Sequence, residues 1–332
     1  MRSFTLLRPN GLGAAGTAAQ AQGTSFIAGG TDLMQLMKIE AETPTHLVDL
    51  VAASGSGPGS DLAQIHQVRG GIRIGALATM AQVAAHPGIR HGWPMISEAL
   101  LSAATPQIRN MGTAGGNLLQ RTRCLYFRSS DSPCNKRIPG SGCPAIRGDN
   151  RELAILGTSA HCIATMPSDM PVALLALNAD IEVHGVDGAK RNVPIATLYR
   201  QPGETPHLDT NLQPGEIITA IFVPASAAAM RSTYVKIRDR QSYQFAVVSV
   251  AVGLEMQAGK IGDVRIAFGG VGTTPWRVPT VEAALIGKEP GAGLFQEAAA
   301  QAAEGALPSS QNAFKATLMS RVLTRTLQTL TA

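Results

Sequence analysis

Short apolar runs alternate with stretches rich in glycine and alanine over the first hundred residues. The apolar run 25–28, the two glycines after it and the segment 31–38 predict a strand, a tight turn and a helix. The same alternation continues downstream. It predicts strands at 46–50 and 72–76, a polar loop at 54–60, a helix from Thr79 and a helix over 94–104.

The middle of the chain is less regular. Glycine and polar residues dominate from Thr105 to Asn150, which predicts irregular structure there. Regular structure is expected again from about Ala160. The pattern then predicts a helix over 171–177, strands at 180–184 and 217–224, and an alanine-rich linker.

The last hundred residues predict strands first and helices afterwards, which is typical of an α+β unit. We therefore predict an α+β fold in two domains: residues 1–224, with subdomains at about 1–55 and 56–224, and residues 225–332. The elements expected in the second domain are strands at 233–237, 246–254 and 264–268, and helices from Thr280, Leu294 and Asn312.

The composition excludes several classes of protein. A chain of 332 residues with 45% hydrophobic content can bury a large core. The net charge of +5 is spread along the chain, so we expect no nucleic-acid partner. Arg8, Pro9 and Asn10 interrupt the opening, and no apolar run is long enough to span a bilayer. We expect no membrane insertion and no export signal in the chain itself, which leaves the cytoplasm, or the periplasm reached on a partner's signal.

Two glycine-rich loops could bind an extended anionic cofactor. Gly29 and Gly30 precede Thr31 and Asp32 at a predicted helix start, where backbone N–H groups favour a diphosphate. The loop matches neither the GxGxxG fingerprint nor a P-loop, and side-chain capping by Thr31 or Asp32 is the alternative. The second loop, 105–117, is costly to order unless a polar cofactor lies along it. An ordinary surface loop is the alternative there.

The four cysteines fall in one window and suggest a metal centre. Cys124, Cys134, Cys143 and Cys162 are spaced C-x9-C-x8-C-x18-C among turn-forming residues. Four thiolates can bind zinc, hold a [4Fe–4S] cluster or form two disulfides, and the paired knuckles of zinc fingers are absent. Nearby cations would stabilise an anionic cluster, although a docking face or a solvated loop also explains them. These cations are Arg121, Arg123, Arg128, Lys136, Arg137, Arg147 and Arg151.

Several motifs together resemble one family. The segments 28–33, 107–117 and 168–171, continued at 236–238 and 268–277, resemble the FAD-binding medium subunits of the xanthine dehydrogenase and molybdenum hydroxylase family, including the carbon monoxide dehydrogenase flavoproteins. The resemblance covers nearly the whole chain. It implies a two-subdomain FAD-binding domain of the PCMH/VAO type, followed by an α+β domain like the C-terminal domain of the carbon monoxide dehydrogenase flavoprotein.

The resemblance also implies which residues contact FAD. The first loop would hold the diphosphate, and the second loop and the Ser-Asp pair would contact the rest of the cofactor. Lys236 would lie near the flavin ring or the phosphates, with a solvated position on a strand edge as the alternative. The residues carried over are Ile27, Ala28, Gly29, Gly30, Thr31, Asp32, Leu33, Thr105, Ile108, Gly112, Thr113, Gly116, Asn117, Asp169 and Lys236.

The cysteine-bearing insertion, at about 121–162, resembles one branch of this family. Segment 117–124 is similar to the periplasmic aldehyde oxidoreductase flavoprotein subunits, and 4-hydroxybenzoyl-CoA reductase has a related [4Fe–4S] insertion. By this resemblance all four cysteines are cluster ligands.

The implied function is electron transfer. A large molybdenum-cofactor subunit would oxidise an aldehyde, and a small [2Fe–2S] subunit would pass electrons to FAD and onward to an acceptor that the sequence does not identify. We identify no catalytic base in this chain. The alternatives are a flavoprotein subunit of another molybdenum hydroxylase, such as xanthine dehydrogenase or hydroxybenzoyl-CoA reductase, a free-standing FAD oxidoreductase, and a non-enzymatic zinc module.

Overall fold

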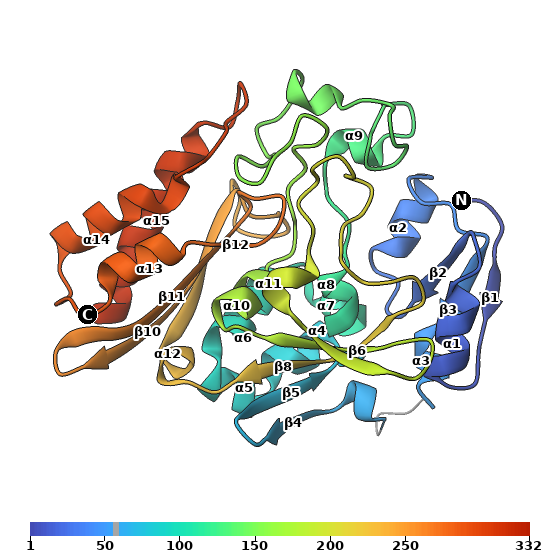
Figure 1. Ribbon diagram of the computed structural model, residues 1–332, viewed down its shortest axis with the longest axis horizontal. Coiled ribbons are helices and arrows are strands. Elements are labelled where there is room, and N and C mark those ends of the chain that lie inside the picture. Colours follow the sequence, from blue (N-terminus) through green and yellow to red (C-terminus); the bar gives the residue numbers. More distant parts are fainter. Residues whose placement is uncertain (56–59) are drawn as a thin grey trace.

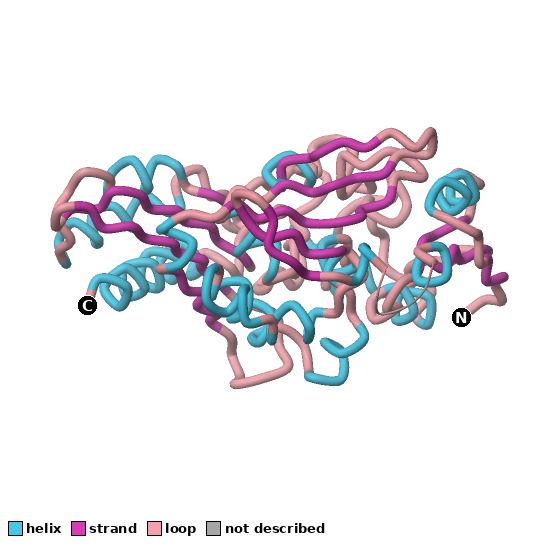
Figure 2. The backbone as a smooth tube through the Cα atoms, turned by 90° about the horizontal axis from the view of Figure 1, so that it is seen from below, coloured by secondary structure: helices cyan, strands magenta, loops and turns pink. Residues whose placement is uncertain are grey.

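The computed structural model describes residues 1–55 and 60–332, in which three β-sheets follow one another along an elongated molecule (Figure 1). The two termini lie at opposite ends in both views (Figures 1 and 2). Positions 56–59 of the predicted loop 54–60 lie outside the described residues.

The first sheet is a small parallel one in the order β1-β3-β2. Leu47 and Val48 in its central strand are fully buried, as expected for a strand covered on both faces. Asp49 ends this strand and accepts hydrogen bonds from the N–H groups of Val51 and Ala52, which starts the next helix. The elements are β1 (Thr5–Leu7), α1 (Leu12–Ala19), β2 (Thr24–Ile27), α2 (Leu33–Lys38), β3 (His46–Asp49) and α3 (Leu50–Ala53).

The second sheet is antiparallel, in the order β4-β5-β8-β6-β7. Ile74, Ile181 and Ile221 from its strands pack with Leu100 and Leu174 from covering helices in one buried cluster. Its strands are β4 (Ile65–Val68), β5 (Gly71–Gly75), β6 (Asp180–His184), β7 (Lys190–Pro194) and β8 (Ile217–Pro224). The helices in this region are α4 (Met80–Ala85), α5 (Pro87–Gly92), α6 (Pro94–Ser102), α7 (Pro106–Met111), α8 (Ala114–Leu118), α10 (Met170–Ala176) and α11 (Ile195–Leu198), with a 3-10 turn at Asp61–Ala63.

The third sheet, in the order β12-β11-β10-β9, packs against the C-terminal helices. Val252, Ile266 and Phe268 of its strands share a buried cluster with Phe295 and Leu323 of those helices. Its strands are β9 (Ser232–Ile237), β10 (Val248–Gln257), β11 (Lys260–Gly269) and β12 (Trp276–Arg277). The helices are α12 (Ala227–Met230), α13 (Pro279–Leu285), α14 (Ala292–Ala300) and α15 (Phe314–Thr331), with a 3-10 turn at Gln301–Ala303.

The cysteine-bearing insertion lies along the upper edge of the molecule in Figure 1, where it reaches from α2 towards the C-terminal helices. Its regular elements among the described residues are the helix α9 (Leu125–Arg128) and a 3-10 turn at Pro144–Ile146. A small apolar cluster places Phe127 and Ile163 of the insertion against Leu36 of α2. Elsewhere the insertion is held mainly by polar contacts.

Several sequence expectations need correction. The interval predicted to be irregular contains α7 and α8, because Thr105 and Thr113 cap helices that the glycine content concealed. The predicted alanine-rich linker contains α12, and β7 was not predicted because only Val193 of that strand is buried. The strands at 180–184 and 217–224 have the predicted bounds. In the described part of the chain, no helix has both the length and the apolar character needed to cross a bilayer.

Lys315 joins the C-terminal domain to the end of the insertion. Its side chain is fully buried, and Nζ donates hydrogen bonds to the carbonyl oxygens of Glu152 (3.0 Å), Leu153 (2.9 Å) and Gly270 (2.7 Å). Every N–H of the ammonium group therefore has an acceptor, which offsets the cost of burying it.

We predict that Lys315→Met lowers the free energy of unfolding by about 3 kcal/mol, because three buried carbonyl oxygens lose their hydrogen-bond donor. Thermal or urea unfolding measures this loss. The matched control is Lys288→Met, which removes an exposed lysine from the same domain and should leave stability unchanged. Equal unfolding midpoints for Lys315→Met and the wild type would contradict the assignment.

Candidate cofactor sites

A cavity of about 740 Å³ lies where the first and second subdomains meet the third sheet. Its walls include both glycine loops, the start of β8, and Lys236 from β9. This volume is within the range of cofactor-binding sites, which are usually concave and mostly apolar with a few polar groups.

Two glycines bring the first loop against the second one. A Cβ atom on Gly29 would collide with the carbonyl oxygen of Met111, so only glycine allows this approach. Gly30 has a φ of 67°, which favours glycine as well. On the other side, a Cβ atom on Gly112 would lie 3.3 Å from Thr31 Oγ1. The cavity therefore depends on close contact between two backbone segments.

Asp32 occupies the N-cap position of α2, but its side chain makes no capping hydrogen bond. The alternative of side-chain capping by Asp32 is therefore wrong. Both of its carboxylate oxygens are directed towards the arginines at the start of the insertion.

The second loop is built from two short capped helices. Thr105 caps α7 through a bond from the N–H of Ile108 (3.4 Å), and Thr113 caps α8 through a bond from the N–H of Gly116 (3.2 Å). Asn117 is buried and accepts a hydrogen bond from Ser168 Oγ (2.6 Å). This bond ties the second loop to the Ser-Asp motif.

Lys236 and Asp169 form a buried ion pair at the cavity wall. Lys236 Nζ lies 2.8 Å from Asp169 Oδ2, and the two side chains are only 3% and 4% exposed. Tyr234 donates its hydroxyl hydrogen to Asp169 Oδ1 (2.6 Å), and burial with the neighbouring Asp169 charge raises the pKa of Tyr234 well above its usual value. The solvated alternative for Lys236 is therefore wrong, and the pair holds the Lys236 amino group in a fixed position beside the cavity.

Every residue predicted to contact the cofactor lines this cavity except Thr105, whose side chain caps α7 instead. Sequence reasoning missed several parts of the wall, including two segments far from the predicted motifs. They are residues 214–218, which lead into β8, and the loop residues Tyr243, Gln244 and Phe245 between β9 and β10. Neither segment has a motif that would have identified it.

The four cysteines line a second, enclosed cavity of about 10 Å³, although they come from distant points of the insertion. Cys124, Cys134 and Cys162 are buried and Cys143 is partly exposed. Burial raises the pKa of Cys124 to about 11 and also raises the pKa values of Cys143 and Cys162. The thiols of Cys124, Cys143 and Cys162 are therefore protonated at neutral pH, and a metal would have to displace their protons.

Polar contacts hold this cysteine cavity together. Arg137 donates to the carbonyl oxygens of Tyr126 and Phe127, and Lys136 donates to Asp209 and to the carbonyl oxygen of Pro206. These cations hold the insertion in its fold, so the solvated-loop alternative does not describe them. Within 1–55 and 60–332, no three His, Cys, Asp or Glu side chains converge closely enough for a single metal ion.

Comparison with known proteins identifies the family. The family described as the FAD-binding domain in molybdopterin dehydrogenase matches residues 2–226, and the carbon monoxide dehydrogenase flavoprotein C-terminal domain matches residues 233–330. The chain belongs to the FAD-binding subunits of the molybdenum hydroxylases. The expected family, its α+β fold and its place as an oxidoreductase subunit are thereby confirmed.

Individual relatives agree with this assignment. The chain is 44% identical over 324 residues to the aldehyde oxidoreductase FAD-binding subunit PaoB of Escherichia coli, which covers 97% of this chain and 96% of that protein. It is 26% identical to the glyceraldehyde dehydrogenase medium chain of Sulfolobus acidocaldarius, over 87% and 83% of the two chains. The solved carbon monoxide dehydrogenase of Oligotropha carboxidovorans superimposes with a TM-score of 0.75 at 25% identity, covering 98% of this chain and 97% of that one.

Proposed function

We propose that this chain is the electron-transfer subunit of an aldehyde oxidoreductase of the molybdenum hydroxylase type, and that it carries FAD and a [4Fe–4S] cluster. The observation that supports the aldehyde substrate is the 44% identity to the E. coli aldehyde oxidoreductase subunit over almost the whole of both chains. A large molybdenum-cofactor subunit and a small [2Fe–2S] subunit would be its partners, since its relatives are medium subunits of larger enzymes.

The cavity of 740 Å³ fits FAD. The backbone of segment 28–33 would hold the diphosphate, because Gly29 and Gly30 leave its N–H groups accessible beside a helix start. Lys236 would supply a positive charge, with its position fixed by Asp169. When bound, FAD can hold one or two electrons, so it links one-electron partners to a two-electron reaction.

The donor set of the insertion fits an iron–sulfur cluster better than zinc. Four cysteines line one enclosed cavity, and four thiolates are the ligands of a [4Fe–4S] cluster. A zinc ion needs four ligands around one centre, and in the described part of the chain no three His, Cys, Asp or Glu side chains form a group that could hold one metal ion. In a cluster each thiolate binds a different iron atom, so wider spacing suits it. Because the cavity holds only about one water molecule, the surrounding segments must move apart on loading.

The complex, purified with its companions, should show flavin absorbance, about four iron atoms per chain for this cluster, and flavin bleaching by an aldehyde such as benzaldehyde. Bleaching by xanthine instead would place the chain in another branch of the family. Catalysis by the isolated chain would favour a free-standing FAD enzyme. A colourless protein that holds zinc would overturn the whole proposal.

We predict that Gly29→Ala lowers FAD affinity at least about tenfold, because the new methyl group pushes the first loop away from Met111. Flavin content and fluorescence titration of the purified complex measure the change. Gly92→Ala is the matched control, since a Cβ atom there meets nothing within 4 Å and lies outside the cavity. Unchanged flavin affinity in the Gly29 variant would count against the diphosphate assignment.

We predict that Cys134→Ser removes the absorption and the iron of this cluster, about four iron atoms per chain, while leaving FAD in place. Cys134 lines the cysteine cavity and does not line the flavin cavity. Metal analysis and the visible spectrum report both cofactors. Ser130→Ala, on the exposed surface of the same insertion, is the control. Full retention of iron by the cysteine variant would contradict the cluster.

A further inference from the structure

Asp32 lies in the first glycine loop, but its side chain contacts residues of the cysteine-bearing insertion. We propose that Asp32 is a positioning residue that fixes the Cys124 turn against the flavin loop, and so sets how the two cofactors lie relative to each other. This inference rests on the proposed function, because it requires both cofactors. It differs from the family-based expectation, in which Asp32 is a contact of FAD.

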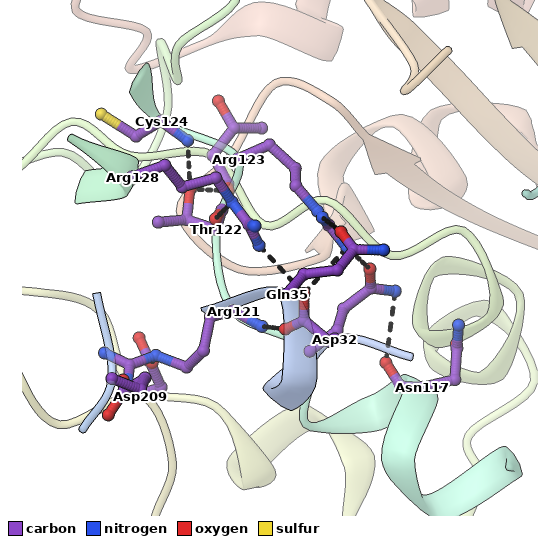
Figure 3. Close-up of polar contacts among 12 residues, drawn as sticks. Asp32, Gln35, Asn117, Arg121, Thr122, Arg123, Cys124, Arg128 and Asp209 are labelled. Carbon is purple, nitrogen blue, oxygen red and sulfur yellow. Dashed lines mark hydrogen bonds and ion pairs between the residues drawn. The ribbon is translucent and has the colours of Figure 1, made fainter. Parts of the chain in front are cut away.

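Both carboxylate oxygens of Asp32 are engaged by the insertion (Figure 3). Oδ2 accepts a hydrogen bond from the backbone N–H of Arg121 (2.8 Å). Oδ1 lies 2.9 Å from Nη2 of Arg123 and 2.9 Å from Nη2 of Arg128. These three charge-assisted bonds use most of the roughly four acceptor sites of the carboxylate.

The two arginines lie on either side of Cys124. Arg123 precedes it, and Arg128 ends α9, whose N-cap is Cys124. Arg128 Nε also donates to the carbonyl oxygen of Thr122 (3.0 Å), and Thr122 Oγ1 accepts from the N–H of Cys124 (3.3 Å). One carboxylate thus fixes both ends of the turn that carries the first cysteine.

Other charges near Asp32 are already paired. Arg121 forms ion pairs with Glu42 and Asp209, and Lys136 also pairs with Asp209. Among the described residues, Asp32 is the carboxylate that pairs with Arg123 and with Arg128. No neighbouring acid can therefore replace it when it is neutralised.

Arg123 extends the same link to the C-terminal domain. Its guanidinium lies over the ring of Phe245, 4.8 Å from the ring centre, and Phe245 lines the flavin cavity. Arg123 itself lines that cavity too. The Asp32–Arg123 pair therefore lies between the flavin cavity and the cysteine turn, where a shift of either segment would move both.

The test compares Asp32→Asn with the wild type in the full complex. Asparagine keeps one acceptor oxygen, so it cannot serve the Arg121 amide and the two guanidinium groups together. We expect amide hydrogen exchange over 121–128 to accelerate about tenfold, the loss expected for a charge-assisted bond. We also expect the magnetic coupling between the flavin radical and the reduced cluster to change in EPR, while FAD content stays near that of the wild type.

Two further variants make the result decisive. Arg128→Gln breaks the same link without altering the flavin loop, and it should give the same exchange pattern. Asp61→Asn removes an acid that pairs with Arg73 on the second sheet, away from both cavities, and should change neither readout. The conservative Asp32→Glu should restore part of the protection.

The outcomes separate this inference from the proposed function. If the wild-type complex contains neither iron nor flavin, the proposed function itself is overturned. If the wild type holds both cofactors but exchange over 121–128 and the magnetic coupling are unchanged in Asp32→Asn, the positioning role is overturned. Loss of FAD from Asp32→Asn, with exchange unaltered in both Asp32→Asn and Arg128→Gln, would show a cofactor ligand instead and would also overturn it.

Discussion

The cavity depends on one backbone contact, the approach of Gly29 to the carbonyl group of Met111. A side chain at this position would separate the first subdomain from the second, because each loop forms one wall. The rest of the architecture supports this contact: a parallel sheet presents the first loop at the end of β2, and capped helices present the second. Separate apolar clusters stabilise the two walls, a small one at the first sheet and a large one at the second sheet.

The insertion is stabilised differently from the rest of the chain. Its apolar cluster is small, and its arginines and Lys136 bind carboxylates and backbone carbonyl oxygens from several segments. Such bonds are directional, so they hold a turn-rich segment in one arrangement without helices or strands. Burial raises the pKa values of Cys124, Cys143 and Cys162, so these thiols are protonated and the cysteine cavity is weakly apolar.

Local signals in the sequence were enough to predict most strands and the first glycine loop. The helix from Thr79 was predictable because Thr79 and Gln82 form a capping box. The helices α7 and α8 were missed because glycine suggested a loop, although Thr105 and Thr113 are ordinary N-cap residues. The contacts of Asp32 could not be predicted, since its partners Arg121 and Arg128 lie 89 and 96 positions away. Tertiary packing alone brings them together.

The position of the insertion explains how one scaffold can carry an additional site. Thr122 Oγ1 donates to the carbonyl oxygen of Thr165 (2.9 Å), so the two ends of the insertion lie side by side. Because the insertion starts and ends at the same place, it does not disturb the register of the sheets. The entropic cost of closing such a loop grows only slowly with its length. The insertion therefore needs contacts of its own side chains to hold it in one conformation. Asp32 orders the start of the insertion, and Asn150 orders its later part. The Asn150 side chain donates to the carbonyl oxygen of Gly148 and to Ser310 Oγ near the C-terminal helix.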